Sequence, residues 1–179
     1  MGKLIALLRG INVAGANKVP MAELRTICEG LGWQNVETYI QSGNVVFQAS
    51  GSAASSETAL EKAIEAHLAL SIPVIVRPAD QWSALVAGNP FAEIAEAEAN
   101  RVMMLLAKAK FDPDAAAALQ ARAADGEQVR QAGEVLWVHY PGGAGTSKLS
   151  PSLFDRLAGS RVTARNWRTV VKLKEMAGA

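Results

Sequence analysis

The order of predicted elements indicates an α+β fold in which one arrangement of strands and helices occurs twice. Over residues 3 to 77 the apolar patterns read as strand, helix, strand, strand, helix and strand. The same order begins again near residue 101, after an acidic, alanine-rich stretch. Such an order folds naturally as a four-stranded antiparallel sheet with both helices on one side, which is the ferredoxin-like (alpha-beta plait) arrangement. We therefore expect a tandem pair of ferredoxin-like modules, a duplication of topology without detectable sequence identity.

The first module is expected to occupy residues 1–78. Its first strand is an apolar run without alternation, which is typical of a central strand. The first helix begins near Pro20 and ends at Gly32. The remaining predicted elements are strands at Val36 to Ile40 and Asn44 to Phe47, a loop at Ala49 to Ser56, a helix at Glu57 to Leu70 and a strand at Pro73 to Arg77.

A helical connector at residues 79–100 is expected to lead into the second module, residues 101–179, which carries a C-terminal helix. The predicted elements are a strand at Arg101 to Leu106, a helix from Asp112-Pro113 to Asp125-Gly126, strands at Glu127 to Gln131 and Glu134 to Tyr140, and a helix from Ser150-Pro151 through Leu157. Only Ser160 to Val162 remains before a last helix starting at Thr163 or Ala164. The second module therefore lacks a clear fourth strand.

Composition limits the classes of function. Half of the 179 residues are apolar and one fifth are charged, the balance of a soluble globular protein. The single cysteine, Cys28, excludes an internal disulfide and is expected to be buried on a helix face. Two histidines and one cysteine share no ligand spacing, so we expect no metal and no cofactor. We see no signal peptide and no membrane-spanning run, which favours a cytoplasmic protein without a membrane partner. The oligomeric state is left open.

Charge is distributed unevenly although the net charge is only +1. Residues 1–21 carry three cations and no acid, whereas residues 54–100 carry seven acids and two cations. Residues 141–179 carry seven cations and two acids. If the two basic ends of the chain meet in space, they make one positive surface.

Arg9 to Lys18, which joins the first strand to the first helix, is richer in polar residues than a turn requires. Its two glycines allow positive φ or close backbone approach. Asn12 and Asn17 supply amide donors and acceptors, and Arg9 and Lys18 supply charge. Such a connection can direct N–H groups and cations at an anion. The alternative is an ordinary loop whose glycines only satisfy geometry.

Two further segments are candidates. In the hairpin turn Tyr39 can stack on a ring while Gln41 and Asn44 read an amide or base edge, although turn chemistry alone also explains them. Ser42 in this turn is no hydrolase nucleophile, because the nucleophile-elbow pattern is absent. The glycine-rich segment ending at Lys148 has the wrong residue order for a phosphate loop, yet it can still hold an anion.

Several of these segments together resemble the bacterial domain of unknown function 1697 family. The matching segments are Leu8 to Val13, Asn17 to Met21, Tyr39 to Phe47, Asn89-Pro90-Phe91, Ser147-Lys148-Leu149, Thr163 to Trp167 and Thr169-Val170. The resemblance implies an α+β fold of two ferredoxin-like modules. It implies no established activity.

These observations favour binding of an anionic ligand, a nucleotide or a short single-stranded nucleic acid, in a cleft between the opening loop and the C-terminal helix. An enzyme acting on a small anionic metabolite is an alternative, but the motif segments carry no Asp, Glu or His as a general base. A structural or protein-interaction module is the third reading. The candidate ligand-binding residues are Arg9, Asn12, Asn17, Lys18, Tyr39, Gln41, Ser42, Asn44, Lys148, Arg165, Asn166 and Trp167.

Overall fold

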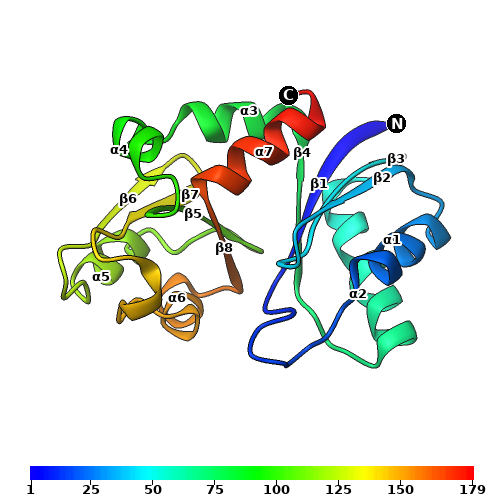
Figure 1. The fold of residues 1–179 in the computed structure, drawn as a ribbon, viewed down its shortest axis with the longest axis horizontal. Helices are drawn as coiled ribbons and strands as arrows, with labels where there is room; N and C mark the ends of the chain where they lie inside the picture. The colour runs from blue at the N-terminus through cyan, green and yellow to red at the C-terminus, as the bar shows by residue number, and fades with distance from the viewer. The chain divides into compact units, whose positions relative to one another are not determined.

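The chain folds into two compact units, each built on its own four-stranded antiparallel sheet (Figure 1). A computed structural model describes residues 1–179. The first unit comprises Met1–Ser83 and Leu173–Ala179, and the second comprises Ala84–Lys172. The unit boundaries fall within the helices α3 (Ala79–Ala87) and α7 (Trp167–Ala177). The mixed α+β class predicted from the sequence is confirmed, with seven α-helices in all.

In the first unit the strands lie in the order β2-β3-β1-β4, and all neighbouring strands are antiparallel. The central strand β1 pairs with β3 on one side and with β4 on the other, so that Leu4 lies between Phe47 and Pro78. The elements are β1 (Gly2–Leu8), α1 (Met21–Gly30), β2 (Gln34–Tyr39), β3 (Asn44–Ala49), α2 (Ala53–Leu68) and β4 (Val74–Pro78).

Helices α1 and α2 lie on the same side of the sheet of the first unit (Figure 1). The β1 side chains that alternate onto this face, such as Ala6, pack with Leu24 of α1 and Leu60 of α2 in one buried cluster. Trp33 stacks on Phe47 of β3 with 3.8 Å between the ring centroids. The apolar run without alternation in β1 is thus buried on the helix-covered face and on the other face as well.

Helix α2 begins four residues earlier than the sequence predicts, so the expected loop from Ala49 to Ser56 is wrong in its second half. The hydroxyl oxygen of Ser52 accepts a hydrogen bond from the backbone N–H of Ser55 at 3.1 Å, which makes Ser52 an N-cap. The small residues that suggested a loop are therefore a cap followed by the first helical turn.

In the second unit the strands lie in the order β6-β7-β5-β8, again with antiparallel neighbours. Helices α5 and α6 pack against one face, where Leu119 and Phe154 join Leu105 and Leu136 of the sheet. The elements are α4 (Ala92–Ala97), β5 (Val102–Ala107), α5 (Ala115–Gln120), β6 (Gln128–Ala132), β7 (Val135–His139), the 3₁₀ helix η1 (Ala144–Thr146), α6 (Pro151–Ala158) and β8 (Val162–Asn166).

The prediction that the second half lacks a clear fourth strand is wrong. Residues 162–166 form the full strand β8, which pairs with β5 from Ala107↔Val162 to Met103↔Asn166. Helix α7 starts only at Trp167, because the amide oxygen of Asn166 accepts a hydrogen bond from the N–H of Thr169 at 3.0 Å. Because β8 carries polar side chains, its sequence lacks the apolar pattern that predicts a strand.

Helix α5 is also shorter than predicted, because it starts at Ala115 and ends at Gln120. The segment after it turns instead of continuing to Gly126. The carboxylate of Glu127 accepts hydrogen bonds from the N–H groups of Ala124 and Asp125, at 3.0 and 2.8 Å, and so fixes this turn.

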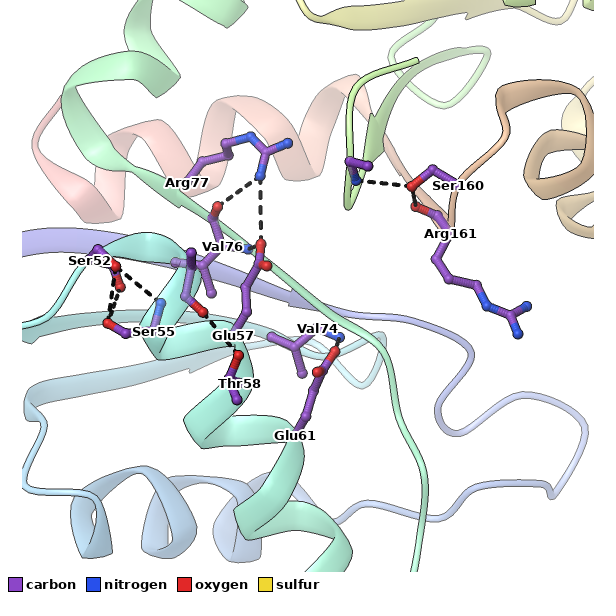
Figure 2. A network of polar contacts seen from close by, with 12 residues as sticks. Ser52, Ser55, Glu57, Thr58, Glu61, Val74, Val76, Arg77, Ser160 and Arg161 are labelled. Carbon is purple, nitrogen blue, oxygen red and sulfur yellow. Dashed lines mark hydrogen bonds and ion pairs between the residues drawn. The ribbon is translucent and has the colours of Figure 1, made fainter. Parts of the chain in front are cut away.

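Carboxylates of helices α2 and α6 bond to the outer edges of the two sheets. Glu57 and Glu61 of α2 accept hydrogen bonds from the N–H groups of Val76 and Val74, each at 2.8 Å (Figure 2). In the second unit Asp155 of α6 accepts from Val162 N–H at 2.9 Å. Strands β4 and β8 lie at sheet edges, where unpaired N–H groups would otherwise need a partner.

Candidate functional site

The opening loop, residues 9–18, uses its asparagine amides to hold its own backbone. The Asn12 amide nitrogen donates to the carbonyl oxygens of Val19 and Gln41, both at 2.9 Å, and its oxygen accepts from Val19 N–H at 2.9 Å. The Asn17 amide donates to Gly10 O at 3.0 Å. Both asparagines adopt positive φ, 54° and 49°. These amides therefore hold the loop in its conformation, because they are hydrogen-bonded to backbone atoms.

The hairpin turn between β2 and β3 lies beside the opening loop at one end of the first sheet. Leu8 N–H donates to Gly43 O at 2.8 Å, and a Cβ at Gly43 would stand 2.6 Å from Ile11 Cδ1. Asn44 is fully buried, and its amide donates to Tyr39 O at 2.8 Å and to Ser42 Oγ at 3.0 Å. The Asn44 side chain is thus part of the turn.

The exposed side chains at this end of the first unit are of mixed character. Lys18 and Gln41 are exposed and available to a ligand. Val13 and Ile40 are also exposed, at 62% and 48%, and Ile40 has φ of 47°, which is unusual for a β-branched residue. This end presents one exposed lysine with apolar neighbours, and the half-buried Arg9 and Tyr39 border it.

The candidate residues at the end of the chain are engaged within the second unit. Arg165 is 7% exposed, its guanidinium donates to Thr163 Oγ1 and Ala164 O at 2.8 Å each, and burial lowers its pKa to about 10. Asn166 caps α7, and the Trp167 ring lies 5.8 Å from that of Trp137. Arg9 belongs to the first unit and Arg165 to the second, so their convergence on one cleft stays a prediction.

A basic pocket lies at the start of helix α6, entirely within the second unit. We call it the α6 pocket, a cavity of about 480 Å³. It contains Lys148, one of the residues selected from the sequence. Its lining residues are Arg122, Lys148, Ser150, Ser152, Leu153 and Arg156.

The α6 pocket is lined by cations and by no acidic residue. Its three cations, Arg122, Lys148 and Arg156, are exposed, and none of them pairs with a carboxylate in the structure, nor does any acid line the cavity. Arg161 nearby in the chain, by contrast, lies 3.0 Å from Asp155. The positive end of the α6 dipole adds to the field of the cations. Like charges gathered in this way repel, and an anion would relieve the repulsion.

Serine side chains shape the entrance of helix α6. Ser150 is its N-cap, accepting a hydrogen bond from Leu153 N–H at 3.4 Å, and Pro151 takes the first helical position. The hydroxyls of Ser150 and Ser152 lie 3.2 Å apart. The pocket therefore offers hydroxyl groups beside its cations.

A buried carboxylate anchors the segment that carries Lys148. Glu127 is 3% exposed and accepts a hydrogen bond from the Ser147 hydroxyl, whose oxygen in turn accepts from Leu149 N–H at 3.1 Å. The Ser147 hydrogen bond holds the pKa of Glu127 below its ordinary value, and the N–H groups of Asp125 and Ala124 act in the same direction. Residues on both sides of Lys148 are thereby fixed.

Sequence reasoning missed Arg122, Arg156 and Glu127 as parts of this site. The Ser147-Lys148 pair just before a Ser-Pro helix start was the available signal. Arg122 lies far from this pair along the sequence, so the sequence gives no indication that they are close in the fold. The sequence predicts that helix α5 continues past Arg122, which would put that side chain on a helix surface.

The fold and the site define an α+β protein of two sheet-based units with a basic pocket in the second. The family described as "Protein of unknown function (DUF1697)" matches residues 1–137, and the chain belongs to this family, as its motifs indicated. A solved structure, that of the conserved bacterial protein SP0830 from Streptococcus pneumoniae, is similar with a TM-score of 0.72 and 25% identity. The match covers 98% of each chain.

Comparison with curated proteins gives no match. In the structure, none of the helices has both the length and the apolar character needed to cross a membrane.

Proposed function

We propose that this protein binds an anionic ligand through the α6 pocket. The observation that supports the proposal is the grouping of Arg122, Lys148 and Arg156 around one cavity without a carboxylate partner. Nucleotides and short single-stranded nucleic acids carry the matching charge, and guanidinium groups bind phosphate with two parallel hydrogen bonds. A cytoplasmic location, where such ligands are abundant, remains part of the proposal.

Binding is favoured over catalysis by the chemistry of the pocket. Its lining residues include no Asp, Glu, His or Cys, so no carboxylate or imidazole in the lining is placed to activate its serines as nucleophiles. Glu127, the carboxylate behind Ser147, is buried, and its hydrogen bonds favour the charged form. An enzyme acting on a small anionic metabolite would need its base from elsewhere.

We also propose that each sheet, with the two helices packed on it, forms a ferredoxin-like module and that the chain is a tandem duplication. Both sheets have the same strand order, and in both a carboxylate of the second helix accepts from the edge strand. Under this proposal residues 1–78 and 101–179 are the two modules and residues 79–100 connect them. The core clusters of helices and sheet in each unit are consistent with it.

Direct titration tests the binding proposal. We expect AMP or an eight-residue thymidine oligonucleotide, followed by calorimetry at low salt, to bind the wild type measurably. The double variant Lys148→Gln with Arg156→Gln should bind at least tenfold more weakly, because two charge-assisted contacts are lost. The control, Lys62→Gln with Lys110→Gln, removes the same charge from exposed positions outside the pocket. Equal weakening in both double variants would refute a specific pocket and leave only general electrostatic attraction.

A further inference from the structure

We infer that the α6 pocket holds the phosphate group of a small phosphorylated molecule and does not read a base. The inference rests on the proposed function and narrows the class of ligand. It follows from the side chains that line the cavity, from the volume of the cavity and from the hydrogen bonds that hold the backbone beside it.

The lining residues suit a phosphate and provide no aromatic ring on which a base could stack. None of them is aromatic, and Leu153, the apolar one, is 9% exposed. Proteins that bind single-stranded nucleic acid rely on aromatic side chains for stacking, at roughly 1–3 kcal/mol per base. Arg122 and Arg156 offer planar guanidinium groups, Lys148 a point charge and Ser152 a hydroxyl, which suits the oxygens of a phosphate monoester.

The size of the cavity fits one small molecule. Its volume of about 480 Å³ falls within the range of small-molecule sites. The cations surround this single cavity, whereas a protein that follows a nucleic-acid strand needs a positively charged groove along several phosphates. A phosphate at the start of α6 would also meet the positive end of the helix dipole.

Hydrogen bonds hold the backbone beside the pocket in place in the absence of a ligand. Glu127 holds Ser147 on one side of Lys148, and Ser147 in turn holds the N–H of Leu149 on the other side. The Ser150 cap fixes the first turn of α6, on which Ser152 and Leu153 lie. A backbone that is already held in place loses less conformational entropy on binding, and such preorganisation favours a specific small ligand.

The test compares ligands that share a phosphate but differ in the base. Ribose 5-phosphate, AMP, adenosine and an eight-residue thymidine oligonucleotide are titrated at constant ionic strength. We expect ribose 5-phosphate and AMP to bind within about threefold of each other and adenosine not to bind. Arg156→Lys, which keeps the charge but loses the planar fork, should weaken both phosphates severalfold, whereas Lys110→Arg should not.

The outcomes separate the two proposals. Tight binding of AMP with little binding of ribose 5-phosphate would show base recognition and overturn the inference while leaving anion binding intact. An oligonucleotide that binds more than tenfold tighter than both small phosphates would do the same. Absence of binding by every phosphate-bearing probe would overturn the inference and the proposed function together.

Discussion

Cys28 lies on the inner face of α1, fully buried beside Leu24 and Ile27. Burial, with a smaller effect from the charge of Glu29, raises its pKa to about 12. The thiolate is the reactive form, so we expect very slow labelling by a thiol reagent at pH 7.5 in the native state and rapid labelling in denaturant. Fast native labelling would mean that α1 opens readily or is placed differently.

Glu127 makes stability depend on pH in the acid range. Because its folded-state pKa is lowered from the ordinary value of 4.5, its contribution is present above that value and is lost as pH falls through the folded pKa. Glu127→Gln should lower the free energy of unfolding at pH 7 by about 1–2 kcal/mol, since the charge-assisted hydrogen bonds that the carboxylate accepts would become weaker neutral ones.

The measurement is chemical denaturation of the wild type and Glu127→Gln between pH 7 and pH 3, with the exposed Glu93→Gln as control. The difference between wild type and Glu127→Gln should shrink below pH 4.5. A difference that stays constant over this range would contradict the assignment of a charged, hydrogen-bonded Glu127.

At the residue scale the sequence shows where polar residues are grouped along the chain but not what their polar atoms bind. The sequence predicts that Asn12 and Asn44 bind a ligand, yet their amides bond to backbone atoms of the loop and the turn. Short amide side chains commonly stabilise turns in this way, and their tolerance of positive φ serves the same purpose. The sequence pattern of an asparagine in a glycine-rich loop is the same whether the residue stabilises a turn or binds a ligand.

At the scale of elements, the edge contacts of α2 should contribute measurably to stability. Glu57→Ala would leave the buried Val76 N–H without its acceptor and would remove the carboxylate that lies 3.7 Å from Arg77 (Figure 2). We expect the free energy of unfolding to fall by about 1–3 kcal/mol. Glu65→Ala, on the exposed face of the same helix, should change it by less than about 0.5 kcal/mol. Equal effects of the two substitutions would show that the edge contact adds nothing.

Elements with a clean apolar pattern were predictable, and those defined by polar contacts were not. Strands β1 and β5 are uninterrupted apolar runs and were placed within one residue of their observed starts. Strand β8 contains Arg165 and Asn166, so its pattern did not indicate a strand. Helix α5 ends early because of the Glu127 side chain, a contact that periodicity does not encode.

At the scale of the whole molecule, the alternation of strands and helices was sufficient to predict two antiparallel sheets, each covered by two helices. The α6 pocket was not predictable to the same degree. Its three cations come from the segment after α5, the segment before α6 and α6 itself, and they meet only because both helices pack on one face of the sheet. Of these three cations, the sequence predicts only Lys148 as a binding residue.

The most direct measurement of the central claim is a nuclear magnetic resonance titration that records backbone amide shifts as ribose 5-phosphate is added. Binding in the α6 pocket predicts saturable shifts at Arg122, Lys148, Ser152 and Leu153, which Lys148→Gln should abolish or weaken at least tenfold. Shifts confined to the opening loop, residues 9–18, and the hairpin turn at Gln41 to Gly43, or no saturable shifts at all, would contradict the account.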